Sequence, residues 1–182
     1  MLDVAVAYSR YQFLGEEFLT WIWFMIENDQ PALQKLDPEL AALEVGHRMV
    51  LVNRHHREAG ETVTIKGDHA GMDEGLLTLK KGGMVAEIHL VYRSGDHEWQ
   101  FSLKGESLNV SSLKVPATGK IESQEDVEGA VIEKIHLCDK AAKLIDQLFG
   151  RFIKLRLGNA WLKRVAPAMR SGSQRLEVLF TT

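Results

Sequence analysis

The 182-residue chain has a single cysteine, Cys138, so it cannot form an internal disulfide. Disulfides stabilise many secreted proteins, so a lone cysteine favours a reducing compartment. Long apolar runs are also absent: the longest, Trp21 to Ile26, is far too short to cross a bilayer. The first residues show no basic segment followed by an apolar stretch, so no signal peptide is expected. The sequence predicts a cytoplasmic protein with no membrane partner.

Catalytic motifs are missing as well. The chain has no GxSxG elbow, Walker loop, GxGxxG or HExxH, and its histidines lack the spacing of metal ligands. Cys138 falls on the apolar face of a predicted helix, which is typical of a structural thiol. We therefore expect no enzyme, no cofactor and no metal. A Mg²⁺-dependent nuclease built on Asp68, Asp73 and Glu74 stays open as an alternative, although acids that open a short helix more often complement its dipole.

What the chain does contain is the composition of an ordinary globular protein. Hydrophobic residues make up 45% and charged residues 26%. A chain of this length buries a sizeable core without disulfides or metals. We expect one domain over residues 1–182, with a subdivision most easily placed at the linker of residues 116–123.

Helical periodicity marks both ends of the chain. Apolar residues at alternating spacings of three and four predict a helix over residues 3–26. Ser123 and Asp126 resemble a capping box that opens a long helix reaching about Leu157. The apolar residues of this long helix recur at spacings of three and four residues from Val127 to Phe152. This near-heptad pattern predicts packing along another long helix.

Two shorter helices are predicted from local signals. Over residues 37–46, Asp37 suits an N-cap, Pro38 a first helical position and Gly46 a terminator. Residues 159–169 predict a final helix that ends near Pro167.

The middle of the chain changes to the two-residue period of strands. Strands are predicted over residues 48–54, 61–67, 84–93, 97–105 and 107–116, and a helix over residues 71–83 is stopped by a double glycine. The predicted fold is therefore α+β: a small, mostly antiparallel sheet packed with a long N-terminal aromatic helix and a long C-terminal helix.

The segment FLGEEFLTWIWF, residues 13–24, is apolar on more than one face of its helix. One interpretation is a central core helix covered on two sides. The alternative is a homodimer interface that uses Leu19, Trp23 and Phe24, because a monomer rarely leaves a large apolar face exposed.

Charge is distributed unevenly. Residues 1–149 carry 15 Lys and Arg against 24 Asp and Glu, whereas residues 150–174 contain six cations and no acid. A basic surface suits phosphate contact, so DNA is the expected partner. Phe152 and Trp161 lie between these cations and either stack on bases or belong to the core. The predicted DNA-binding residues are Arg151, Lys154, Arg156, Lys163, Arg164 and Arg170, with Arg54 and Arg57 of the NRHHR turn.

Several segments together resemble short bacterial recombination-associated proteins of the RdgC type. They are FLGEEFLTWIWF, HRMVLVNR, IKGDHAGMDEGLLTLKKG, WQFSLKGESLNVSSLKVP and DVEGAVIEKIHL with LFGRFIKLRL. The resemblance implies a non-enzymatic DNA-binding protein. Longer members of this family form a ring-like homodimer, bind duplex DNA with little sequence preference and restrain RecA-driven recombination.

The leading prediction is thus a nucleoid-associated homodimer that binds DNA without strong sequence preference, in recombination or replication. The alternative is a protein–protein adaptor that uses the aromatic helix or the basic tail.

Overall fold

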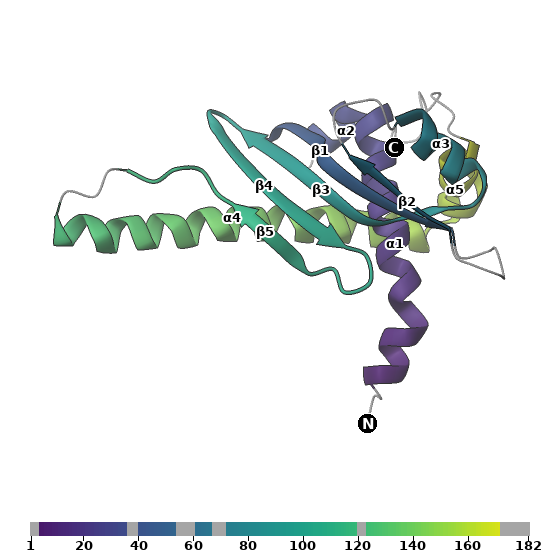
Figure 1. Ribbon diagram of the computed structural model, residues 1–182, viewed down its shortest axis with the longest axis horizontal. Coiled ribbons are helices and arrows are strands. Elements are labelled where there is room, and N and C mark those ends of the chain that lie inside the picture. Colours follow the sequence, from purple (N-terminus) through teal and green to yellow (C-terminus); the bar gives the residue numbers. More distant parts are fainter. Residues whose placement is uncertain (1–3, 36–39, 54–60, 67–71, 120–122, 172–182) are drawn as a thin grey trace.

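The computed structural model describes residues 4–35, 40–53, 61–66, 72–119 and 123–171, with backbone alone at residues 4–13, 61, 66, 72–74, 76, 124, 125 and 171. The predicted α+β class is confirmed (Figure 1). None of the described helices is long and apolar enough to cross a bilayer. In chain order the elements are α1 (Val4–Asn28), α2 (Gln30–Gln34), β1 (Leu40–Asn53), β2 (Glu61–Lys66), α3 (Met72–Lys80), β3 (Met84–Ser94), β4 (His97–Lys104), β5 (Val110–Lys114), α4 (Gln124–Leu157), the π-helical turn η1 (Trp161–Val165) and α5 (Ala166–Ser171).

The strands form one antiparallel sheet in the order β2-β1-β3-β4-β5. Along β4, the buried Trp99, Phe101 and Leu103 alternate with more exposed neighbours. This alternation puts the apolar side chains on one face, which the helices cover. The sheet therefore supplies one wall of the core.

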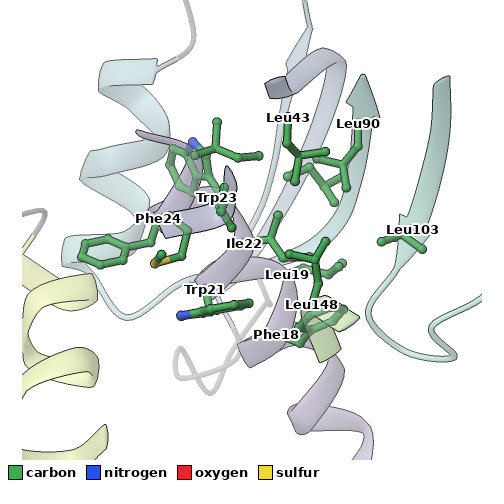
Figure 2. Close-up of a cluster of buried hydrophobic side chains, with 14 of the residues drawn as sticks. Phe18, Leu19, Trp21, Ile22, Trp23, Phe24, Leu43, Leu90, Leu103 and Leu148 are labelled. Carbon is green, nitrogen blue, oxygen red and sulfur yellow. The ribbon is translucent and has the colours of Figure 1, made fainter. Parts of the chain in front are cut away.

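Helix α1 is the centre of that core. It contacts β1, β3 and β4 on the sheet and also α4 and α5. Figure 2 shows Leu19 and Ile22 on the side of the strands, whereas Trp21 and Phe24 point toward the segment that carries α5. From Phe18 to Ile26 every residue is buried, including Thr20. A helix that is apolar all round is stable in water only when it is enclosed in this way.

The predicted dimer interface at Leu19, Trp23 and Phe24 is wrong. These side chains are only 0%, 1% and 5% exposed within a single chain. The sheet and the other helices already cover both apolar faces of α1, so none of the three side chains is left for a second copy. The core interpretation of the aromatic segment is confirmed.

The helix predicted over residues 37–46 is also wrong, because β1 begins at Leu40. Leu40 and Leu43 are both buried, three residues apart, as on a helix face. The register with β3 shifts between Leu40 and Ala42, and this bulge brings both leucines to the same side of the sheet. Gly46 terminates nothing; it lies in a second register shift, where a β-carbon would overlap the ring of His89.

Helix α4 begins and ends close to its predicted bounds. The Ser123 hydroxyl accepts from the Asp126 N–H at 3.2 Å, and the Asp126 carboxylate accepts from the Ser123 N–H at 2.7 Å, so the capping box is confirmed. The helix docks on the sheet where the Trp99 Nε1–H donates to the Leu137 carbonyl at 2.9 Å. N-terminal to this contact, α4 extends past the edge of the sheet (Figure 1).

The end of the described chain differs from the prediction. Pro167 does not stop a helix, because it lies near the start of α5. It has no N–H to donate to the preceding turn, and a wider turn, η1, comes just before it, in which the Ala166 N–H bonds to the Trp161 carbonyl.

Two histidine rings meet on the sheet, His47 from β1 and His89 from β3, with centroids 4.0 Å apart. His89 is 5% exposed, and its Nδ1 has no hydrogen-bond partner among the described residues. Burial, then the nearby His47 and Lys114, lower the pKa of His89 below its usual 6.5. A protonated His89 is therefore unfavourable in the folded chain.

We expect this histidine to make the fold less stable in mild acid. A lowered pKa means that the folded chain binds fewer protons than the unfolded chain, so the stability present above about pH 6.5 is lost as the pH falls below it. The urea midpoint should fall between about pH 7.5 and pH 5.5 in the parent, and fall less in His89→Gln. His97→Gln, at an exposed histidine of β4, is the control. An equal fall in all three proteins would contradict the assignment.

Candidate nucleic-acid interface

A cavity of about 600 Å³ opens where the C-terminal part of the chain meets α1 and the α3–β3 turn. Four cationic side chains and one carboxylate, Glu17, line it. Its lining residues are Glu17, Thr20, Leu79, Lys80, Lys81, Gly82, Gly83, Met84, Arg156, Trp161, Leu162, Ala166, Met169 and Arg170.

The α3–β3 turn places two of these cations. The Gly82 N–H donates to the Leu79 carbonyl and the Gly83 N–H to the Thr78 carbonyl, each at 2.9 Å, which is a Schellman motif. Gly82 has a φ of 86°, a conformation that favours glycine. The double glycine thus ends α3 sharply and leaves Lys80 and Lys81 exposed at the cavity edge.

Buried polar groups hold this turn and the cavity floor in place. The side-chain amide of Asn53, which is 0% exposed, donates to the Lys81 carbonyl at 3.2 Å. The Thr20 hydroxyl donates to the Glu16 carbonyl at 2.7 Å and accepts from the Val85 N–H at 2.9 Å. These bonds tie β1, α1 and β3 together beneath the cations, so the cavity has a fixed floor.

Among the four cations that line the cavity, Arg156 is held by an ion pair and by an aromatic ring. Its Nε donates to the Glu17 carboxylate at 2.6 Å, with both side chains mostly buried. Its guanidinium also lies 5.3 Å from the centre of the Trp161 ring. Arg156 therefore joins the end of α4 to α1 and η1, and part of its charge is neutralised by Glu17.

The aromatic residues of the basic tail are core residues. Phe152 is 0% and Trp161 is 2% exposed, and their rings meet edge to face at 5.4 Å. The interpretation in which Phe152 and Trp161 stack on bases is wrong, because neither ring has a free face. They support the cavity from beneath instead.

The predicted DNA-binding residues are only partly brought together. Arg156 and Arg170 line the cavity, and Lys163 and Arg164 are exposed on η1 between them in the chain. Lys154 is exposed and Arg151 is half-buried on α4. Arg54 and Arg57 lie outside the described residues.

Lys80 and Lys81 were missed by the sequence analysis. The signal was present: two lysines stand immediately before the double glycine that was predicted to end a helix. The cations that line the cavity come from separate parts of the chain, because α3, which Lys80 ends, packs against α5, which carries Arg170.

Helix ends modify the electrostatics of this region. Both α3 and α4 end here, and each helix C-terminus carries about half a negative charge. Four cations complement those ends: Lys80 in the last turn of α3 and Lys81 just after it, and Lys154 and Arg156 in the last turn of α4. The exposed cations of η1 and α5 come in addition, so the region stays positive.

The described residues contain no group of three or more His, Cys, Asp or Glu side chains that could hold a metal ion. Asp68 and the side chains of Asp73 and Glu74 lie outside the described residues, so the nuclease alternative stays a prediction.

No family model, curated protein or solved structure matches this chain.

Proposed function

We propose that this protein is a non-enzymatic, sequence-tolerant DNA-binding protein that acts as a homodimer in recombination or replication, associated with the nucleoid. The observation that carries the proposal is the convergence of Lys80, Lys81, Arg156 and Arg170 around one cavity. Exposed Lys163 and Arg164 extend this positive region, called here the basic end.

The basic end suits phosphate better than a neutral ligand. A phosphate diester carries a permanent negative charge, and flexible, exposed lysines and arginines neutralise it while releasing counterions. Apart from Lys80 and Lys81, residues 1–149 carry far more acids than bases, so they repel DNA and leave the basic end as the favourable contact.

The same geometry explains tolerance of sequence. Phosphate contacts set position and orientation but carry no base information. No described aromatic ring of the basic end is free to stack on a base, because Trp161 and Phe152 are buried. Binding through cations alone therefore accepts any duplex.

We expect duplex affinity to fall steeply with salt, with a log–log slope of about −0.9 per phosphate neutralised. Alanine at Lys81, Lys163, Arg164 and Arg170 together should flatten that slope, by roughly one unit for each cation that contacts a phosphate. Fluorescence anisotropy with a labelled duplex over a salt series measures both quantities. Urea unfolding should barely change, since all four side chains are exposed.

Lys114→Ala is the matched control, because Lys114 is exposed on β5, at the opposite edge of the sheet from β2. It should keep the parent slope. An unchanged slope in the quadruple variant would move the site away from the basic end. Cleavage of the duplex with Mg²⁺, abolished by Asp73→Ala, would instead promote the nuclease alternative.

The adaptor alternative uses the same cations to hold an acidic protein. It forecasts no DNA retention even at low salt, and retention of an acidic protein that is lost in the quadruple variant. The salt series therefore separates the two functions directly.

A further inference from the structure

The N-terminal part of α4 leaves a set of aliphatic side chains in water. Every residue from Asp126 to His136 except Ala130 is exposed. Four large aliphatic residues are among them: Val127 at 41%, Val131 at 53%, Ile132 at 68% and Ile135 at 64% exposed. An isolated helical extension of this length is only marginally stable in water, and aliphatic residues on it gain nothing from exposure.

Val127, Val131 and Ile135, with the half-buried Cys138 and the exposed Ala142, form a continuous stripe called here the α4 seam. The spacings of four, four, three and four residues keep all five on one side of the helix. A second stripe, which includes Leu137, Ala141 and Leu144, is buried against the body of the protein. The α4 seam lies about 100° around the helix from this buried stripe, so its side chains from Val127 to Ile135 stay outside the contacts that hold α4 in place.

As far as the structure describes it, to Gly119, the segment that leads into α4 contacts the helix away from the seam. Its described contact with the helix is the Gly119 N–H, which lies 3.5 Å from the Glu133 carboxylate. Glu133 is two residues from both Val131 and Ile135, which is about 200° around the helix. At Gly119 the chain therefore lies on the side of α4 opposite the seam.

We propose that the α4 seam pairs with the same seam of a second copy, antiparallel, about a twofold axis near Ile135. This inference rests on the homodimer in the proposed function and replaces the interface that the sequence predicts on α1. Val131 would lie opposite Cys138 of the second copy, and Val127 opposite Ala142 of the second copy. A twofold axis makes one such stripe complementary to itself.

The charge along α4 selects the second copy and the orientation. Residues 124–133 contain four acids and no lysine or arginine, whereas residues 134–143 contain three lysines and one acid. Antiparallel pairing places the acidic half of each helix beside the basic half of the other. Parallel pairing would place acid beside acid, which is unfavourable.

The first measurement is mass in solution without DNA. Light scattering on the full chain at micromolar concentration should give twice the 20.5 kDa chain mass for the parent. Val131→Lys combined with Ile135→Lys should halve the measured mass. Leu157→Lys is the matched control, since Leu157 lies on the same helix, is 82% exposed and is far from the seam; it should remain a dimer.

The second measurement fixes orientation through the single cysteine. Under mild oxidation Val131→Cys should form a covalent dimer with Cys138 of the second copy, while the parent should not cross-link. In the antiparallel pair the two native thiols are separated by about 10 Å along the axis, too far for a disulfide. Cross-linking of the parent would instead indicate parallel pairing and overturn the proposed orientation.

The outcomes separate this inference from the proposed function. A double lysine variant that stays dimeric overturns the α4 interface but leaves a homodimer, and the edge of β5, which no described strand pairs with on its outer side, is then the next candidate surface. A monomeric parent overturns both the interface and the homodimer. The salt series measures duplex affinity separately, so a loss of DNA binding is distinguished from a loss of the dimer.

Discussion

Gly15→Ala is expected to destabilise the fold by at least about 3 kcal/mol, toward the upper end of overpacking effects. Gly15 on α1 faces the backbone of Gly105, just after β4, and a β-carbon at Gly15 would overlap the Gly105 carbonyl oxygen. The position of a β-carbon is fixed by its own backbone, and the Gly105 carbonyl is also backbone, so no side-chain rotation relieves this clash. Helix and strand must move apart, and that movement opens the core around α1.

Thermal unfolding measures the effect. For a chain of this size the loss corresponds to about 6–12 °C in the midpoint. Gly150→Ala supplies the matched control: the same atoms are added in a helix, but nothing lies within 4 Å of the new β-carbon. That variant should be more stable than the parent by up to about 1 kcal/mol, because alanine favours the helix. Equal effects at the two sites would refute the close backbone contact.

Phe152→Ala is the second substitution with a large expected effect, about 3–5 kcal/mol. Phe152 is fully buried, and its ring contacts the rings of Phe18, Trp21 and Trp161. These contacts join α4 to α1 on one side and to η1 on the other. Removing the ring leaves a cavity where three elements meet, and the floor of the basic end loses its support.

Urea unfolding of two further variants tests that account. Phe152→Leu keeps most of the volume and should cost less than about 1.5 kcal/mol. Leu157→Ala, at a side chain that is 82% exposed on the same helix, should change stability by less than about 0.5 kcal/mol. If Phe152→Ala cost no more than Leu157→Ala, the ring would not be part of the core.

Elements specified by neighbouring residues were predicted well from the sequence. The capping box of Ser123 and Asp126 lies within four residues, and Gly82 and Gly83, which end α3, follow the last residue of that helix by two and three positions. The strands with regular alternation, such as β4, were found for the same reason. In each case the interactions that decide the structure are local, so the pattern alone contains them.

Elements decided by distant contacts were not predicted. Leu40 and Leu43 have helical spacing, and only pairing with β3 through a bulge makes them part of a strand. The apolar character of Trp23 and Phe24 could be read from the sequence, but whether the sheet or a second copy covers them depends on packing.

The basic end shows the same division. The presence of six cations and no acid in residues 150–174 follows from the amino-acid sequence alone. The packing of the folded chain brings Lys80 and Lys81 together with Arg156 and Arg170 around one cavity, and it encloses Phe152 and Trp161 beneath them. Charge is a property of composition and survives in any conformation. Burial and convergence depend on how α3, α4 and α5 pack, and that is settled by contacts between residues far apart in the chain.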